Sequence, residues 1–377
     1  MLKSIFGLLS FLVIMPATVE NLPSQTEDSK GHHIQVALLL DTSNSMDGLI
    51  DQAKSQLWKM VNELATSKKD GESPTIEIAL YEYGNDALSG AEGYIRQVTG
   101  LTADLDLVSE KLFGLTTNGG SEYCGAVINR AVGQLVWSDS NDDMKIIIVA
   151  GNEPFDQGPD PYRDACKTAI GKGIMINTIF CGNYDEGVRT FWKDGADLAD
   201  GKYFNIDQDQ QVIHISTPHD QRILDLNEKL NSTYIGYGDQ GEQRVQMQST
   251  QDSNAASYGA ANAAERASFK AKESYKNTSW DLVDAMEEDE AVIEKLDKDD
   301  LPAEMKDMDK KEQKEYVEAK AKEREEVRKE ILELEEKAKE YQAEKRKEMS
   351  ESGEDTLDKV MSKTIREQAE KKGFKYN

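Results

Sequence analysis

Cysteine and histidine, which build most zinc sites and many catalytic sites, are scarce in this chain. Its 377 residues include four histidines and three cysteines, Cys124, Cys166 and Cys181. No cysteines have CxxC spacing, and no histidines have HxxxH or HExxH spacing, so the common zinc motifs are excluded. The odd number of cysteines leaves two arrangements open, which are one disulfide with a free thiol and three buried thiols.

Several enzyme signatures are also absent, and positive charge is in short supply. The sequence contains no GxxxxGK[ST] phosphate loop and no GxSxG nucleophile elbow. Acidic side chains number 71 against 45 basic ones, which gives a formal net charge of −26. Phosphate backbones and anionic membrane surfaces would repel such a chain. We therefore expect a protein that is not an enzyme and has no nucleic-acid partner.

Long apolar runs are missing except at the N-terminus. That region begins with Lys3 near the first residue and continues with an apolar run from Ile5 to Met15, followed by small residues. This order is typical of a signal peptide, which we assign to residues 1–19, with a polar linker at 20–32. The run is shorter than the ~20 residues a membrane span needs. We expect an exported protein, periplasmic or associated with the cell envelope, without a stable membrane span after cleavage.

Residues 33–212 contain a regular alternation of apolar strands and amphipathic helices. The expected strands are residues 33–40, 75–84, 94–98, 144–151, 174–182 and 202–206. Strands that alternate with helices predict a parallel arrangement, and strands that are apolar on both faces predict helices on both sides. The fold class is therefore α/β, with a doubly wound, mostly parallel six-stranded sheet.

A long, highly charged helical region follows this sheet domain. Residues 213–250 are expected to form a closing helix and a linker, and residues 251–377 a helical C-terminal region. Between residues 308 and 347 a short heptad seam steps by three and four through Val317, Lys320, Arg324, Val327, Ile331, Leu334, Ala338 and Tyr341. Two interpretations stay open. The seam forms an intermolecular coiled coil that drives self-association, or the helix folds back on the alanine-rich helix before it.

The first strand ends in an unusual group of oxygen donors. The segment VALLLDTSNSMDG runs from apolar residues into Asp41, followed at alternate positions by Ser43 and Ser45. In a doubly wound sheet, ligands bind at the carboxyl ends of the strands where the strand order reverses. A carboxylate and two hydroxyls are hard ligands that suit Mg²⁺ or Mn²⁺. The segment therefore predicts part of a divalent-cation site.

These three residues resemble the DxSxS signature of the metal-ion-dependent adhesion site (MIDAS) of von Willebrand factor type A (VWA) domains. The strand and helix order from about residue 33 to residue 210 resembles that fold as well. The resemblance implies Mg²⁺ or Mn²⁺, and a partner protein whose acidic side chain completes the coordination. Later phrases such as AGNEPF and SWDLVDAM resemble exported bacterial proteins with one VWA domain, which implies a bacterial cell-envelope setting.

The family also supplies a threonine from a second loop and an aspartate from a third. The segment LTTNGGSEYCGAVI resembles the second loop, with Ser121 at the threonine position and Thr117 as an alternative. The third loop, VAGNEPFDQG, departs from the family because Gly151 stands at the aspartate position. Asn152 and Glu153 follow it, and either can act on the cation directly or through a water molecule.

Three functions compete on these grounds. The first is a metal-dependent protein-binding or adhesion module of the envelope. The second is a metal-independent scaffold or assembly protein that acts through its helical C-terminal region, as the missing third-loop aspartate suggests. The third is a phosphotransferase of the haloacid dehalogenase type, which also has an aspartate at the end of its first strand. That chemistry needs a second acid two residues later, where this chain has Ser43.

Overall fold

A computed structural model describes residues 32–206, 215–350 and 357–376 of the chain. The expected signal peptide, and the expected linker apart from its last residue, lie outside these ranges. Within them, no helix is both long enough and apolar enough to span a bilayer.

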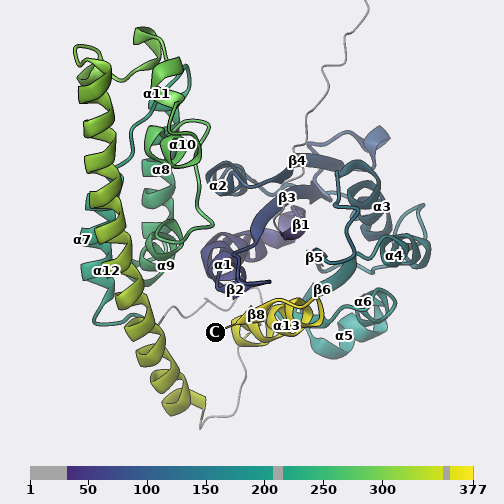
Figure 1. The fold of residues 1–377 in the computed structure, drawn as a ribbon. Coiled ribbons are helices and arrows are strands. Elements are labelled where there is room, and N and C mark those ends of the chain that lie inside the picture. Colours follow the sequence, from purple (N-terminus) through teal and green to yellow (C-terminus); the bar gives the residue numbers. More distant parts are fainter. Residues whose placement is uncertain (1–31, 207–214, 351–356, 377) are drawn as a thin grey trace, which may run out of the picture. The chain divides into compact units, whose positions relative to one another are not determined.

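The central element is a six-stranded sheet with the order β4-β3-β1-β5-β6-β7 (Figure 1). The strands are β1 (His33–Asp41), β3 (Thr75–Tyr83), β4 (Ile95–Thr102), β5 (Met144–Gly151), β6 (Met175–Cys181) and β7 (Tyr203–Ile206). All neighbouring pairs are parallel except β3 and β4. The predicted doubly wound, mostly parallel sheet is therefore confirmed. Its strand order reverses between β1 and β5, which is where such sheets bind ligands.

Alternate residues of β1 enter two separate cores. Val36 and Leu38 pack in one core with the helices α1 (Asp47–Ala65) and α2 (Leu105–Phe113). Leu39 packs in the other, on the opposite face of the sheet. The helices of that face are α3 (Cys124–Gln134), α4 (Tyr162–Gly171) and α6 (Trp192–Asp197), with the short α5 (Tyr184–Arg189) before α6. Apolar residues on both faces of a strand are explained by this double cover.

The second part of the chain is helical. Its elements are α7 (Asp220–Asn231), α8 (Gly241–Ala256), α9 (Ala260–Lys270), α10 (Leu282–Glu288), α11 (Val292–Lys295), the 3₁₀ turns Lys298–Asp300 and Ala303–Met305, and α12 (Lys310–Ser350). The boundary expected between residues 250 and 251 falls inside α8.

The heptad seam of α12 is buried by helices of the same chain. Val317 and Ile331 are fully buried, and α12 contacts α7, α9, α10 and α11. Arg324, a charged member of the seam, is buried too and donates hydrogen bonds to the carboxylates of Asp281 and Asp284 at 2.6 and 2.8 Å. The structure thus shows the fold-back interpretation of the seam.

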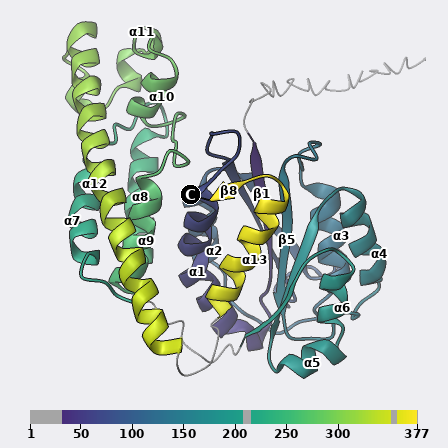
Figure 2. The same cartoon turned by 60° about the horizontal axis from the view of Figure 1, so that its bottom comes forward.

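The end of the chain returns to the sheet domain. Figure 2 shows α13 (Leu357–Lys371) in yellow beside α1. The amides of Asn177 in β6 and Gln368 in α13 exchange two buried hydrogen bonds of 3.0 and 2.9 Å. The strand β8 (Lys375–Tyr376) then pairs with β2 (Ser67–Lys68), which follows α1. The helices α7 to α12 are therefore an insertion between β7 and the last helix of the sheet domain.

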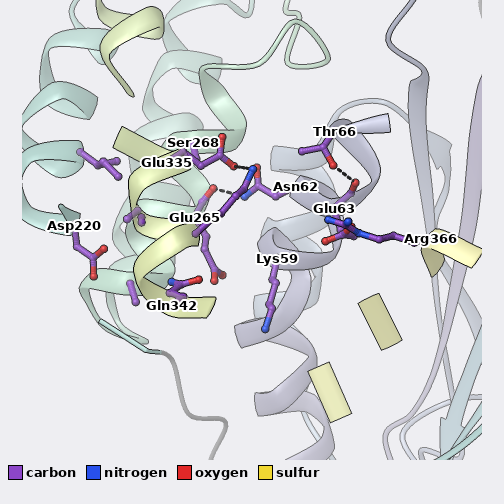
Figure 3. A pocket seen from close by; sticks show the side chains of 15 residues that line it. Lys59, Asn62, Glu63, Thr66, Asp220, Glu265, Ser268, Glu335, Gln342 and Arg366 are labelled. Carbon is purple, nitrogen blue, oxygen red and sulfur yellow. Dashed lines mark hydrogen bonds and ion pairs between the residues drawn. The ribbon is translucent and has the colours of Figure 1, made fainter. Parts of the chain in front are cut away.

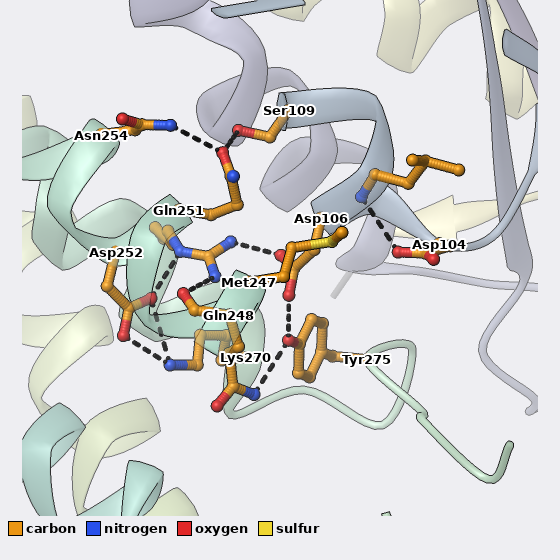
Figure 4. A network of polar contacts seen from close by, with 12 residues as sticks. Asp104, Asp106, Ser109, Met247, Gln248, Gln251, Asp252, Asn254, Lys270 and Tyr275 are labelled. Atoms are coloured by element: carbon orange, nitrogen blue, oxygen red, sulfur yellow. Dashed lines mark hydrogen bonds and ion pairs between the residues drawn. The ribbon is translucent and has the colours of Figure 1, made fainter. Parts of the chain in front are cut away.

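A buried ionic network fastens this insertion to α2 (Figure 4). Arg266 of α9 bonds to Asp106 of α2 at 2.7 Å and to Asp252 of α8 at 2.5 Å. Lys270 donates to Asp252 at 2.9 Å, and both basic side chains are fully buried. Breaking one partner of such a pair leaves an uncompensated buried charge, so the network opposes separation of the two parts.

Candidate metal centre

Asp41 ends β1 at the point where the strand order of the sheet reverses, and its carboxylate is incompletely satisfied. The side chain is fully buried, and Oδ1 accepts a 2.8 Å hydrogen bond from the backbone N–H of Ser43. Oδ2 has no hydrogen-bond partner among the residues that the structure describes. A buried carboxylate oxygen without a partner is costly. A bound cation would supply the missing interaction.

Two glycines lie against this carboxylate. A Cβ atom on Gly84 would lie 2.8 Å from Asp41 Oδ1, and one on Gly151 would lie 3.0 Å from Oδ2 and 2.6 Å from Tyr83 Oη. The Tyr83 hydroxyl donates a 2.9 Å hydrogen bond to the Ala150 carbonyl and is fixed there. Gly151 is therefore required by its neighbours. The position where the resemblance expects an aspartate has no room for its Cβ.

The second loop brings Glu122 to the same place. Glu122 is only 6% exposed. A Cβ atom added to Gly84 would lie 2.7 Å from Glu122 Cγ and 2.8 Å from Asp41 Oδ1, so both side chains lie against this glycine. The preceding Gly120 explains this approach, because a Cβ there would lie 2.0 Å from the Gly84 carbonyl oxygen. The two carboxylates therefore flank one glycine.

The other predicted ligands have different positions. Ser43 is 4% exposed and lies beside the carboxylate of the strand end. Ser45 falls in a 3₁₀ turn (Asn44–Met46), and its side chain lies outside what the structure describes. Ser121 is partly buried, whereas Thr117 donates its hydroxyl hydrogen bond to the Asp47 carboxylate. Ligand roles for Ser45 and Ser121 stay predictions.

The third loop adds a further negative charge. Glu153 is partly buried, and its backbone carbonyl accepts a 2.8 Å hydrogen bond from Trp192 Nε1, which fixes the loop against α6. Asn152 is also partly buried. The charge of Glu153 raises the pKa values of both Asp41 and Glu122, so it lies within electrostatic reach of both. Roles for Asn152 and Glu153 on a cation stay predictions.

Neighbouring carboxylates oppose the ionisation of Asp41 and of Glu122. Burial raises the pKa of Asp41 to about 7, the hydrogen bonds from Ser43 lower it in part, and the charges of Glu122 and Glu153 raise it further. Burial likewise raises the pKa of Glu122 above its usual value, and the charge of Glu153 adds to this effect. A divalent cation between these groups would remove the repulsion.

The donors at this position fit a hard divalent cation. Within the described ranges, no three or more His, Cys, Asp or Glu side chains gather closely enough to hold a metal. Asp41, Glu122 and Ser43 nevertheless provide two carboxylates and a hydroxyl at the end of β1, and Asp41 Oδ2 is unsatisfied there. Mg²⁺ and similar ions bind through one or two carboxylates and keep several waters. The residues therefore fit the cation that the sequence predicted.

The cysteines take no part in a disulfide. All three lie within the described residues, and all are free and buried. Cys124 Sγ lies 3.6 Å from Tyr83 Oη, and burial raises the pKa of its thiol well above the usual value. The structure thus shows the second of the two arrangements, three buried thiols, and a buried neutral thiol is unreactive.

A hollow lies away from the end of β1, between α1, α7, α9, α12 and α13 (Figure 3). It is a cavity of about 260 Å³ with a floor of small residues such as Ala261 and Ala264. Several of its charged side chains are paired, as Glu63 is with Arg366, and Glu335 with Lys272. Because these charges are already matched, the cavity is a weaker candidate than the end of β1.

The sequence reasoning missed Glu122 and Tyr83. Glu122 directly follows the expected hydroxyl position in GGSE, so a signal was present, but the spacing does not show which of two adjacent side chains turns inward. Tyr83 ends β3 and pairs with Asp41 across the sheet. Two strands that end level place their last side chains side by side, and the register alone could have indicated this neighbour.

Comparison with known proteins gives similarities in structure only. No protein-family model and no curated protein matches the sequence. Matching solved structures include BatB, a conserved hypothetical protein from Bacteroides thetaiotaomicron (17% identity, 46% of this chain and 90% of that one, TM-score 0.36). A von Willebrand factor type A structure from Catenulispora acidiphila matches at 18% identity (46% and 39%, TM-score 0.35). Proximal thread matrix protein 1 from the mussel byssus, with a zinc-occupied MIDAS motif, matches at 15% (48% and 43%, TM-score 0.37). The chain spans less than half the length of the last two.

Proposed function

We propose that this chain is a non-enzymatic protein-binding module of the bacterial cell envelope that depends on a divalent cation. The observation that carries the proposal is the unsatisfied Oδ2 of Asp41, buried at the switch point of the sheet. Ser43 and Glu122 lie beside the other oxygen of the same carboxylate, Oδ1. The envelope setting is supported by the apolar N-terminal run of the sequence.

The chain's own groups would hold and orient the ion. The Asp41 carboxylate, fixed through Oδ1 by the Ser43 N–H, directs its other oxygen at the site. Gly84 and Gly151 let two backbone segments approach that carboxylate closely. When bound, the cation would supply a coordination position at which a carboxylate of a partner protein can bind.

A binding role fits this site better than phosphotransfer. A nucleophilic aspartate must reach its substrate, yet the Asp41 side chain has no exposed surface. The position two residues later, where phosphotransferases of this type carry an acid, is Ser43. These features support the proposal that the chain is not an enzyme.

The test compares the full chain with Asp41→Ala and with Asp156→Ala, which removes an exposed carboxylate of the third loop. Cation binding is followed by calorimetry with Mg²⁺ and Mn²⁺, and partner capture from envelope extract is compared with and without EDTA. The proposal expects cation binding and EDTA-sensitive capture for the wild type and Asp156→Ala, and neither for Asp41→Ala. Capture that survives both EDTA and Asp41→Ala would overturn it and favour a scaffold acting through the helical insertion.

A further inference from the structure

We propose that Glu122 is a direct ligand of the cation and occupies the coordination position that a partner's carboxylate would take. The site would then be completed from within the chain, and a partner would bind by displacing this side chain. The inference rests on the proposed function and adds a residue for which the family pattern offers no counterpart.

The position of Glu122 is the first step. Its Cγ and Asp41 Oδ1 approach the same point beside Gly84, at 2.7 and 2.8 Å. The side chain also hydrogen-bonds to Ser43, the second donor of the strand end. One carboxylate from β1 and one from the second loop thus converge on one hydroxyl, and Asp41 Oδ2 is left unsatisfied within the described residues.

The burial of these donors is the second step. Asp41, Ser43 and Glu122 are 0%, 4% and 6% exposed. A partner's carboxylate must reach the ion itself, and these side chains offer it almost no surface. Glu122 comes from a loop rather than from a strand, so it is the donor that can turn aside with the least disturbance of the sheet.

The backbone on both sides of Glu122 is closely packed. Gly120 presses on the Gly84 carbonyl, and Tyr123 packs against Gly158, where a Cβ would lie 2.5 Å from the tyrosine ring. The loop is therefore held on both sides of Glu122. In this proposal the carboxylate is therefore displaced by rotation of the Glu122 side chain, while the loop backbone stays in place.

The charge balance is the third step. The two carboxylates of Asp41 and Glu122 match the charge of one divalent ion. Glu153 lies near enough to both to add repulsion. A partner carboxylate added to this set would leave excess negative charge in a buried site, which is unfavourable. If a partner carboxylate replaces that of Glu122, the net charge of the site does not change. The charges therefore favour replacement of Glu122 over binding of a third carboxylate.

The test uses Tb³⁺ as a luminescent probe on the full chain, with lifetimes in H₂O and D₂O to count waters on the ion and Mg²⁺ competition to measure affinity. Variants are Glu122→Ala, the isosteric Glu122→Gln and Ser121→Ala, with Asp156→Asn as the distant control. Acetate serves as the carboxylate probe. Urea unfolding checks that each variant is folded.

The inference expects Glu122→Ala to weaken cation binding by about 10-fold or more, since even outer partners of metal ligands contribute that much. The ion should carry more water in this variant, and acetate should displace that water at lower concentration than in the wild type. The affinity and hydration of Glu122→Gln should fall between those of Glu122→Ala and the wild type, and Ser121→Ala tests the other donor of the second loop separately.

Two failures are distinguishable. If the wild type binds no cation, the proposed function is lost and the inference with it. If the wild type binds the cation and Asp41→Ala does not, but Glu122→Ala and Glu122→Gln keep the affinity and hydration of the wild type, the inference alone is overturned. Loss of binding in Ser121→Ala together with an unaffected Glu122→Ala would instead assign the second-loop ligand to Ser121.

Discussion

The buried carboxylate at the end of β1 predicts an unusual pH dependence of stability when cations are removed. Burial raises the pKa of Asp41 to about 7, whereas an unfolded aspartate titrates near about 3.9. Between these values the folded chain keeps a proton that the unfolded chain has lost. The free energy of unfolding therefore falls as pH rises through this interval. The stabilisation is complete below about pH 4 and is lost above about pH 7.

The magnitude follows from the same two values. Each pH unit in the interval costs about 1.4 kcal/mol, so the roughly three pH units between them correspond to a loss on the order of 4 kcal/mol. Solvent screening does not reduce this figure, because the Asp41 side chain has no exposed surface. An asparagine at this position carries no charge at any of these pH values. Asp41→Asn should therefore abolish the part of the loss that comes from Asp41.

The assay is urea unfolding in EDTA from about pH 5 to about pH 8, for the wild type, Asp41→Asn and the exposed control Asp156→Asn. The advantage of Asp41→Asn over the wild type should grow by several kcal/mol as pH rises. A hydrogen bond to Glu77 raises the pKa of His33, so stability from this pair is also lost with rising pH. All three proteins share that contribution, and it cancels in the comparison. An advantage that stays constant across this range would refute the reasoning.

Two further predictions concern the packing of a strand end and a buried ion pair. Gly151→Ala should cost about 1 to 3 kcal/mol in urea unfolding, because its Cβ would meet Tyr83 Oη at 2.6 Å; an unchanged midpoint would contradict the close packing of that strand end. Arg324→Met should cost about 3 to 5 kcal/mol, because it leaves the Asp281 carboxylate buried without its partner. The exposed Lys329→Met of the same helix is the control and should change stability by less than about 0.5 kcal/mol.

Local patterns in the sequence were sufficient to predict the sheet, but not to predict what closes it. The residues of β1 and β5 are apolar at nearly every position, so cover on both faces could be expected. The helix α13 is amphipathic, and its pattern shows which face is apolar but not which surface that face covers. Its partner, Asn177 in β6, is distant in the sequence, and no spacing rule connects it with Gln368.

The residues of the candidate site also fall into those that local sequence patterns could predict and those that depend on contacts between distant segments. Asp41 and Ser43 could be predicted because strand ends in a parallel sheet meet at one edge. The inward turn of Glu122 depends on Gly120 pressing on a neighbouring loop, which is a contact between distant segments. In the sequence, Gly151 stands where the VWA resemblance expects an aspartate, which suggested that a metal ligand had been lost. In the structure it is the residue that lets Tyr83 and Asp41 lie side by side.

The long helix shows how a correct pattern can have two outcomes. The heptad spacing around Arg324 is equally suited to a partner chain and to a helix of the same chain. Asp281 and Asp284 decide between them, because together they neutralise the guanidinium inside the molecule. A charged residue in a seam is therefore informative only when its partner can be identified.

The return of α13 to the sheet has a consequence for how the chain folds. The face that α13 covers stays open until the whole insertion from α7 to α12 has been made, so the strands cannot reach their final packing in the order of synthesis. Contacts between segments this far apart in sequence slow folding and prolong the exposure of apolar surface. The apolar face beneath α13 thus stays exposed to solvent until the two ends of the sheet domain meet.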